Sequence, residues 1–322
     1  MTTLVTGAGL IGTAFARHAI ARGEKVVFFD PEPRADFLEF KLGKEGYAFA
    51  RKDVRDLPAL IGMIQAHKID TIVHTAGLIG GRVEASLSNA FDINLGGTRN
   101  VAEAARLTRV KRLVHISTFG VYDARRRAVG PVTEDHPRGA GRGYGNFKGA
   151  KELILEAYAN AYSFELIMLR PAYVFGFGHF WSGSSGGKKL QNLLESGLDE
   201  RPVSVKSSDA VTNEYVYAAD MGRAVDLAAT VPMPPVNVFN IGNGQATTFG
   251  EVVDAVRSIF PKLAVEIEPG EPAAAKNCPL DISRARQHLG WEPKFSLNSA
   301  FEDYLGEMKA ARSRPTNQKA SS

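Results

Sequence analysis

Tyr144 and Lys148 are the residues of this chain whose types and spacing point most directly to acid–base chemistry. Tyr144 is the one tyrosine in the sequence that has a lysine four residues later. Positions i and i+4 share a helix face, so the phenol and the ammonium lie one turn apart. A free tyrosine has a pKa of about 10, and a neighbouring cation favours the phenolate and lowers that pKa. The pair predicts a phenol that exchanges a proton with a substrate oxygen; the alternative is a surface pair on an amphipathic helix.

Two hydroxyl side chains, Ser117 and Thr118, follow the apolar run at residues 113–116. A hydroxyl at the end of a strand is able to hydrogen-bond a reacting oxygen and stabilise the charge that develops there. We predict this role for Thr118 rather than for Ser117, and we keep both as catalytic candidates. The alternative is that the hydroxyl caps its own turn.

A glycine-rich turn near the N-terminus predicts a phosphate site. Gly7, Gly9 and Gly12 occupy the three glycines of the pattern G-x-G-x-x-G, between an apolar run and a helical stretch. Gly7 allows the tight turn, Gly9 lets the backbone approach a pyrophosphate, and Gly12 lets the helix pack closely on the sheet. The helix N-terminus presents free N–H groups and a positive dipole end to the phosphates. An ordinary tight strand–helix turn is the alternative.

Asp30 ends the second predicted strand, at residues 25–30, close to the spacing of about 20 residues expected for a ribose-binding carboxylate. Its carboxylate would accept hydrogen bonds from the ribose of NAD and repel the extra phosphate of NADP. We therefore expect NAD as the cofactor, with Arg34 leaving some tolerance of NADP. The nicotinamide would carry the hydride while Tyr144 handles the proton.

Strands and helices alternate through the first half of the chain. Strands are predicted at 47–50, 71–74, 113–116 and 164–169, and helices at 57–67, 89–107 and 144–162. This rhythm predicts an α/β fold with a Rossmann-type, doubly wound parallel sheet and right-handed crossovers, which binds ligands at the carboxyl ends of its strands.

The rhythm changes after Pro171. Residues 176–189 are rich in Gly, Ser and aromatic residues, and we predict a loop over the site. Further strands are predicted at 214–217 and 238–242, and helices at 220–230, 248–260 and 296–309. We expect an NAD-binding domain at 1–171 joined by parts of 213–243, a smaller C-terminal substrate domain at 172–312, and a disordered tail at 313–322.

The composition excludes several classes of protein. The 322 residues carry a net charge of +4, and the basic residues are scattered apart from the triplet at 125–127, so we expect no nucleic-acid partner. The single cysteine, Cys278, allows no disulfide within the chain and fits a reducing compartment. No apolar run is long enough to span a bilayer, and no signal peptide is visible. We therefore predict a cytoplasmic protein with no membrane partner, no metal site and a small-molecule substrate.

The motifs taken together resemble the extended short-chain dehydrogenase/reductases of the NAD-dependent epimerase/dehydratase family. The similarity covers nearly the whole chain, and the ordered set is more specific than any one motif. The matching segments are residues 6–12, Asp53-Val54, residues 74–77 (His-Thr-Ala-Gly), residues 94–98 (Asn-Leu-Gly-Gly-Thr), Ser117-Thr118 with Val121-Tyr122, Tyr144 with Lys148, and residues 281–286 and 289–293.

This resemblance implies a role for each matching residue. Tyr144 would be the acid/base, Lys148 would hold the nicotinamide ribose and tune Tyr144, and Thr118 would bind the substrate oxygen. Asp53 and Val54 would lie against the adenine ring. The full set of predicted cofactor-binding residues is Gly7, Gly9, Leu10, Ile11, Gly12, Asp30, Asp53, Val54, Thr75, Ala76, Gly77, Asn94, Tyr144, Lys148, Pro171 and Val174. The resemblance also implies a homodimer in which helices 89–107 and 144–162 form a four-helix bundle.

Two departures from the family pattern bear on the substrate. Members that act on sugar nucleotides usually carry Asn where this chain has Tyr173, and Arg where it has Asn213. Both family residues contact the diphosphate, and losing a charge-assisted Arg contact removes about 1.5–3 kcal/mol. We expect Arg82, His136, Phe180 and the loop at 176–189 to shape the substrate pocket.

Three hypotheses of function follow. The leading one is an NAD-dependent oxidoreductase that acts on a non-nucleotide secondary alcohol or ketone, such as a sugar acid, a lactol or a hydroxylated ring. The first alternative is a nucleotide-sugar epimerase or dehydratase that holds NAD tightly. The second alternative is a non-catalytic module that senses NAD(H).

Overall fold

A parallel sheet of seven strands forms the centre of the molecule. The computed structural model describes residues 1–126, 128–139, 143–178, 185–271 and 278–314. The strand order is β10-β6-β5-β4-β1-β2-β3, and each neighbouring pair is parallel. The strands are β1 (Thr2–Thr6), β2 (Lys25–Asp30), β3 (Tyr47–Arg51), β4 (Thr71–His74), β5 (Arg112–Ile116), β6 (Glu165–Pro171) and β10 (Val238–Ile241).

The chain builds this sheet outward in both directions from β1. It runs from β1 to β2 and β3 on one side, and then returns to place β4, β5 and β6 on the other side. The strand order reverses between β1 and β4, and such a switch point is where doubly wound folds bind their ligands. The predicted Rossmann-type sheet is confirmed.

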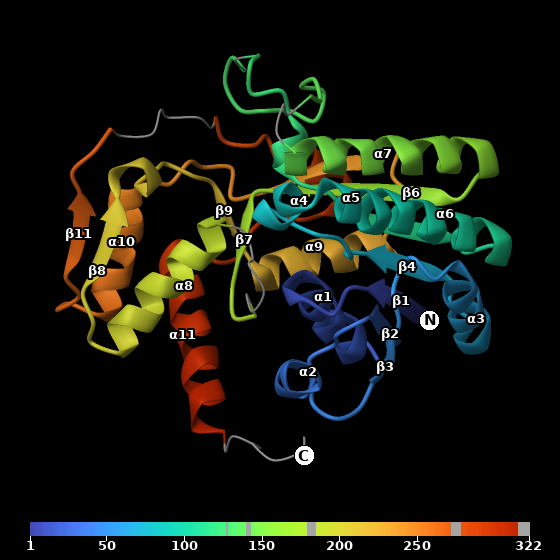
Figure 1. The fold of residues 1–322 in the computed structure, drawn as a ribbon, viewed down its shortest axis with the longest axis horizontal. Helices are drawn as coiled ribbons and strands as arrows, with labels where there is room; N and C mark the ends of the chain where they lie inside the picture. The colour runs from blue at the N-terminus through green and yellow to red at the C-terminus, as the bar shows by residue number, and fades with distance from the viewer. Residues whose placement is uncertain (127, 140–142, 179–184, 272–277, 315–322) are drawn as a thin grey trace.

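Both faces of the sheet are covered by helices, which explains the continuous apolar runs of its strands. Neighbouring residues of β1 belong to different apolar core clusters. Val5 packs with α1 (Leu10–Ala21) and α9 (Ala218–Thr230). Leu4 packs with α3 (Leu57–His67), α6 (Gly97–Thr108) and α7 (Gly143–Tyr162). Figure 1 shows α6 and α7 above the sheet and α1 and α9 below it.

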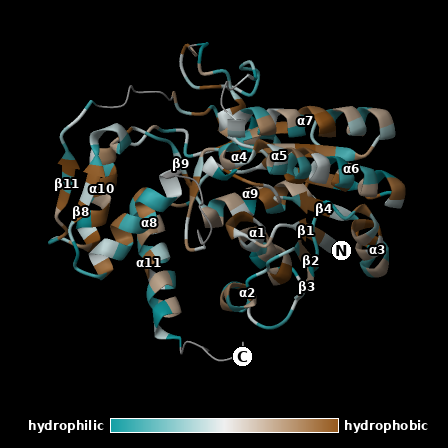
Figure 2. Ribbon diagram, in the orientation of Figure 1, coloured by the Kyte–Doolittle hydropathy of each residue, from teal (hydrophilic) through white to brown (hydrophobic). Residues whose placement is uncertain are grey.

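The remaining elements gather around a second apolar cluster, on the left in Figure 1. They are β7 (Tyr173–Phe175), α8 (Ser185–Leu198), β8 (Val203–Lys206), β9 (Tyr215–Tyr217), α10 (Phe249–Ile259), β11 (Val265–Glu268) and α11 (Leu297–Ser313). β7 pairs with β9, and β8 pairs with β11. Figure 2 shows hydrophobic and hydrophilic residues mixed along α8, α10 and α11, as expected of helices that bury one face.

Three predictions of local structure need correction. The helix expected at 89–107 consists of α5 (Leu87–Ala90), the π-helical turn η1 (Phe91–Gly96) and α6. The loop expected at 176–189 ends early, because α8 starts at Ser185; residues 179–184 lie outside the described part. Ser313, expected to begin a disordered tail, is the last residue of α11; residues 315–322 lie outside the described part.

Several short elements were not expected from the sequence. They are β7, β8, β11, α2 (Ala35–Leu42), α4 (Gly81–Ala85), the short helical turns η2 (Phe119–Val121) and η3 (Ser207–Asp209), and the π-helical turn η4 (Ala285–Leu289). The domain boundaries given above stay a prediction.

Candidate functional site

The turn from β1 to α1 lies at the switch point and leaves room for a phosphate. Gly7 has a φ of +93°, and a Cβ there would lie 2.5 Å from the Thr75 hydroxyl oxygen. That hydroxyl donates to the carbonyl oxygens of Thr6 (2.7 Å) and Gly7 (3.1 Å). A Cβ on Gly9, in contrast, would meet nothing within 4 Å. The backbone of Gly9 therefore faces open space beside the N-terminus of α1, and this geometry fits a dinucleotide.

Asp30 joins the end of β2 to the glycine turn. Its Oδ2 accepts a hydrogen bond from the Ala8 amide, and its Oδ1 accepts one from the Glu32 amide, both at 2.8 Å. The carboxylate therefore stands at the turn, where a ribose-binding acid is needed. Arg34 pairs with Asp36 at 2.7 Å.

The segment predicted to meet the adenine is fixed by α6. Asp53 binds the Arg55 guanidinium at 3.0 Å (Nε) and 2.8 Å (Nη2). Val54 is buried against Gly97, where a Cβ would lie 2.5 Å from a Val54 methyl group. The Asn100 side chain donates to the carbonyl oxygens of Val54 (3.2 Å) and Arg55 (2.8 Å).

Thr118, Tyr144 and Lys148 come together at the end of β5. The Thr118 side chain accepts from the Gly120 amide at 3.1 Å and lies close enough to the Tyr144 phenol to influence its pKa. Lys148 Nζ donates to the Ile116 carbonyl oxygen at 2.6 Å and lies 6.0 Å from the centre of the Tyr144 ring. Ser117 instead donates its hydroxyl proton to the buried Glu152 carboxylate. The geometry places Thr118, and not Ser117, beside the phenol.

Burial controls the protonation of this group. Burial raises the pKa of Tyr144, although the Thr118 side chain opposes the shift. Burial also lowers the pKa of Lys148 to about 8, against the attraction of Glu152. In the chain without a cofactor, Lys148 therefore does not lower the pKa of Tyr144; the expected lowering, which also involved the positive nicotinamide ring, stays a prediction. The Lys148 ammonium is bonded to a carbonyl rather than to the phenol, and desolvation of the phenolate dominates.

Asn94 holds the turn that follows β4. Its side chain accepts from the Leu78 amide at 2.6 Å and donates to the Leu78 carbonyl at 3.0 Å. Gly77 in this turn has a φ of +149°, and a Cβ there would lie 2.9 Å from Asn94 Oδ1. Asn94 belongs to η1, and π-turns inside helices are frequent at functional sites.

The same turn contacts Lys151, a residue that sequence reasoning missed. Its Nζ donates to the Ala76 carbonyl oxygen at 2.9 Å, and the side chain is fully buried. The sequence feature that could have pointed to Lys151 is its position three residues after Lys148, on the same helix face.

The last predicted cofactor residues contribute apolar surface. Leu10 and Val174 are buried in the cluster that packs on the α1 and α9 side of the sheet, and Ile11 packs against them. Pro171 is buried at the end of β6.

The two substrate-linked departures lie close together. The Tyr173 ring packs edge-on against Phe119, with 5.0 Å between centroids, and lies 6.2 Å from Tyr215. The Asn213 amide is buried and donates to the Tyr215 hydroxyl at 3.2 Å, and its backbone pairs with Thr247.

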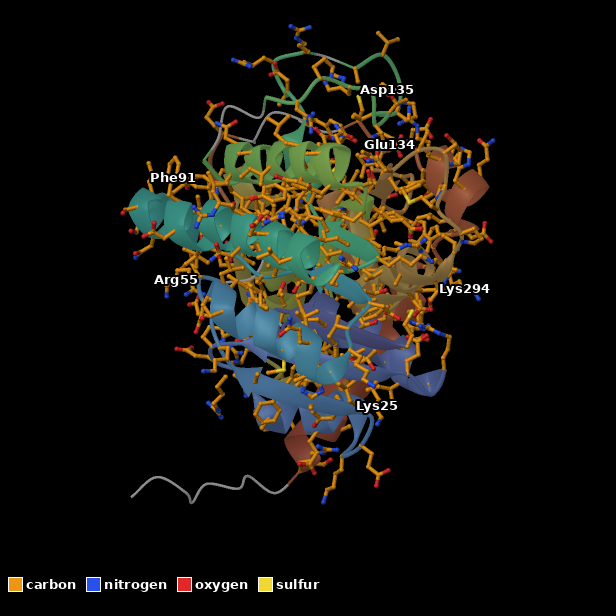
Figure 3. The ribbon with its side chains drawn as sticks, turned by 90° about the vertical axis from the view of Figure 1, so that its right-hand side faces the viewer. Lys25, Arg55, Phe91, Glu134, Asp135 and Lys294 are labelled. Atoms are coloured by element: carbon orange, nitrogen blue, oxygen red, sulfur yellow. The ribbon has the colours of Figure 1, made fainter. Side chains whose placement is uncertain are left out.

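Arg82 and His136, predicted to shape the pocket, have different surroundings: α4, which carries Arg82, packs through Val83 against Phe147 and Tyr144 of α7. Arg82 is exposed in α4. His136 lines a cavity of about 470 Å³ with Glu134, Asp135, Arg138, Arg170 and Arg284, near the residues labelled at the top of Figure 3. Tyr144 and Thr118 do not line that cavity. Phe180 lies outside the described residues.

The described ranges contain neither a membrane-spanning helix nor a cluster of metal-binding side chains. None of the helices there is both long and apolar enough to cross a membrane. None of the His, Cys, Asp and Glu side chains there form a group of three or more that could hold a metal ion.

Comparisons with known proteins identify the family. Residues 3–242 match the NAD dependent epimerase/dehydratase family. The chain is 31% identical over 304 residues to a UDP-glucose 4-epimerase of Mycolicibacterium smegmatis, covering 92% of this chain and 95% of the relative.

Solved structures agree with this match in fold. A UDP-glucose 4-epimerase of Thermotoga maritima, solved with UDP-glucose, superimposes with a TM-score of 0.86 at 24% identity, covering 97% of this chain and 100% of that one. The NAD complex of a Thermus thermophilus UDP-glucose 4-epimerase gives 0.81 at 25% identity, with the same coverage. These relatives favour the nucleotide-sugar alternative over a non-nucleotide alcohol. The chain belongs to the NAD-dependent epimerase/dehydratase family and is an NAD-dependent enzyme.

Proposed function

We propose that this chain is a nucleotide-sugar epimerase that uses NAD held within the protein. The observation that carries the proposal is that Tyr144 and Lys148 of α7 meet Thr118 at the carboxyl end of β5, on the same edge of the sheet as the glycine turn. The relatives support the substrate class, because the matches described above are named UDP-glucose 4-epimerases.

The residues that fit the dinucleotide have separate tasks. The turn at Gly7 and Gly9 would hold the diphosphate at the N-terminus of α1. Asp30 would accept hydrogen bonds from the adenosine ribose, and Lys148 from α7 would donate to the nicotinamide ribose. Bound NAD supplies a hydride acceptor and, later, a hydride donor.

The chain's own acid–base residues would carry the proton. Tyr144, as phenolate, would take the hydroxyl proton while the sugar carbon loses its hydrogen as hydride. The resulting ketone would then regain hydride on its opposite face while Tyr144 returns the proton, which gives the epimer with all atoms balanced. Thr118 would hydrogen-bond the reacting oxygen throughout. The phenolate requires the positive charges of Lys148 and the oxidised nicotinamide, since burial alone favours the neutral phenol.

The first test is the nicotinamide content of extensively dialysed protein, followed by incubation with UDP-glucose and analysis for its 4-epimer. Near-stoichiometric NAD and epimerisation are the expected results. In Tyr144→Phe, turnover should fall by about 10²–10⁴-fold while the NAD content stays unchanged. Tyr162→Phe, which alters an exposed tyrosine of the same helix, is the matched control.

Two results would overturn the proposal. One is an NAD-loaded protein that leaves a panel of nucleotide sugars unchanged, and the other is full epimerisation by the Tyr144→Phe variant. A protein that arrives without NAD but reduces added NAD in the presence of a simple alcohol would favour the second candidate, a dehydrogenase. The observation favouring that candidate is Asn213, whose amide donates to the Tyr215 hydroxyl at the position where the resemblance implies a diphosphate-binding Arg in members that act on sugar nucleotides.

We also propose that a second copy of the chain covers one exposed apolar face. Leu87, Phe91 and Leu153 are 53%, 58% and 56% exposed, and they belong to α5, η1 and α7. Figure 3 shows Phe91 at the outer surface of these helices. A face of this kind fits the four-helix bundle expected from the resemblance.

A further inference from the structure

Lys151 is a buried amine that the proposed mechanism does not use. Tyr144, Lys148 and Lys151 stand at positions i, i+4 and i+7 of α7 and therefore share a face. The Lys151 side chain is fully buried, and none of the ion pairs within the described ranges includes its amine. A buried amine without an acidic partner destabilises a fold.

The carboxylate next to Lys151 in the sequence is bound to other cations. Glu152, the next residue of α7, is held by Arg170 Nη2 at 2.7 Å and by Arg138 Nη1 at 3.0 Å. It also accepts the Ser117 hydroxyl proton. The charge of Lys151 is therefore left without local compensation.

The amine lies directly behind the turn predicted to line the dinucleotide. Lys151 Nζ donates to the Ala76 carbonyl oxygen at 2.9 Å. A Cβ built on Gly77 would lie 3.3 Å from the same Nζ. The amine therefore lies directly against the backbone of Gly77, one of the residues predicted to line the dinucleotide.

The groups around Lys151 offer no negative charge. From α7 it faces Lys148, and from η1 the neutral amide of Asn94 lies on the same side of Gly77. From β4 and β5 it faces the imidazoles of His74 and His115, whose pKa values are held well below the usual range by burial first and by Lys151 and Lys148 second. Burial and the Lys148 charge likewise hold the pKa of Lys151 well below its usual range.

We propose that Lys151 changes the relative stability of the oxidised and reduced forms of the bound cofactor. It acts as a positioning residue, because it places a positive charge without an acidic partner behind the Ala76–Gly77 turn. The oxidised nicotinamide ring carries a positive charge and the reduced ring is neutral, so a buried cation nearby disfavours NAD⁺ relative to NADH. In an epimerase this favours the half of the cycle in which the sugar is a ketone. The inference rests on the NAD site of the proposed function, and not on the identity of the sugar.

The test compares the affinities of NAD⁺ and NADH, measured on the full-length protein by NADH fluorescence and competition. Lys151→Gln keeps a donor for the Ala76 carbonyl but removes the charge, and Lys151→Met removes both. Lys25→Gln, an exposed lysine at the start of β2, is the control. We expect both Lys151 variants to bind NAD⁺ more tightly relative to NADH by about tenfold, and the control to match wild type.

The pH dependence of the NAD⁺ and NADH affinities distinguishes an effect of the Lys151 charge from an effect of the shape of its side chain. In wild type the preference for NADH should be largest at acid pH, where Lys151 is protonated, and should decline as the pH rises through the lowered pKa of Lys151. Lys151→Gln should lack this decline. Lys151→Arg should keep the preference at every pH, since a guanidinium does not lose its proton.

Two results would overturn the assignment. One is a ratio of affinities that is the same in wild type and in folded Lys151→Gln. The other is an equal weakening of both affinities, which would give Lys151 a purely structural role. Neither measurement needs a sugar substrate, so a failure here is distinct from a failure of epimerisation. Lys151→Gln and Lys151→Arg keep the experiment decisive if Lys151→Met does not fold.

Discussion

Lys148 shows how one buried residue links stability to pH. Its pKa is about 8 in the fold, against 10.5 for the free side chain, because burial disfavours the charged amine. The folded state therefore binds fewer protons than the unfolded state between these values, and the stability contributed by Lys148 rises with pH through that window. Below this pH range Lys148 is protonated in both states, and the fold is destabilised by the full cost of burying its charge.

We predict that Lys148→Met unfolds with a free energy about 1–2 kcal/mol higher than wild type at neutral pH, and that it shows less stabilisation on going to alkaline pH. The expected gain is smaller than the pKa shift implies, because the Ile116 carbonyl oxygen loses its donor. Urea denaturation at both pH values measures this. A variant that is less stable at neutral pH would contradict the account.

His115 makes the acid side of the stability profile testable. The ring is fully buried, and within the described ranges neither of its nitrogens makes a well-formed hydrogen bond. Its pKa lies well below the free value of 6.5, first through burial and then through Lys151 and Lys148. The folded state keeps this ring neutral while the unfolded state takes up a proton, so the stability linked to His115 is present above pH 6.5 and is lost as the pH falls.

We predict that His115→Phe weakens the loss of stability in acid and leaves the stability at neutral pH within about 1 kcal/mol of wild type. His67→Phe, at an exposed position of α3, should leave the acid profile unchanged. Denaturant titrations across the acid range compare the two variants. Parallel profiles for His115→Phe and wild type would rule out this role for His115.

At the scale of elements, η1 connects the helix of the expected dimer face to the turn after β4. The π-turn carries Asn94, which satisfies both backbone groups of Leu78. We predict that Asn94→Ala lowers the free energy of unfolding by about 1–3 kcal/mol and weakens NAD binding, because the Ala76–Gly77 turn loses its support. Asn89→Ala, at an exposed site of α5, is the control. Unchanged NAD affinity in a folded Asn94→Ala would separate the turn from the cofactor.

Glu152 connects α7 to β6 across the buried interior. It is fully buried and binds Arg170 with both oxygens, at 2.9 Å (Nε) and 2.7 Å (Nη2). Burial raises the pKa of Glu152, but the hydrogen bonds from Arg170, Ser117 and Arg138 and the charge of Arg170 together outweigh it and lower the pKa, which favours the ionised carboxylate.

We predict that Glu152→Ala lowers the free energy of unfolding by about 3–5 kcal/mol, because Arg170 is left buried without its partner. Glu156→Ala removes a half-buried carboxylate that binds Arg138 alone, and should lower it by about 1 kcal/mol or less. Chemical denaturation compares the two, and equal effects would contradict the buried-pair account.

At the scale of the whole molecule, the proposed interface on α5, η1 and α7 can be tested through the oligomeric state. We predict that wild type sediments as a dimer and that a Phe91→Glu, Leu153→Glu double variant sediments as a monomer, because the added charges would be buried at the interface. Met233→Glu changes an exposed apolar residue after α9 and should stay dimeric. A monomeric wild type, or a dimeric double variant, would show that this face is not the interface.

The sequence by itself determined the local geometry of this protein. Gly7 and Gly12 tolerate no Cβ, the apolar runs have the period of buried strands and helices, and Tyr144 and Lys148 are one helical turn apart. Such constraints act over a few residues, so they could be predicted from the chain alone, as could the parallel, doubly wound sheet that the alternation of strands and helices indicates.

Only the tertiary structure decided what these side chains meet. Ser117 pairs with Glu152, 35 residues away, and Lys151 reaches Ala76, 75 residues away. The Asn213 amide is buried against Tyr215, and burial raises the pKa of Tyr144 in the chain without a cofactor. Partners and desolvation depend on which distant segments the sheet brings together, and the period of a single segment carries no information about them.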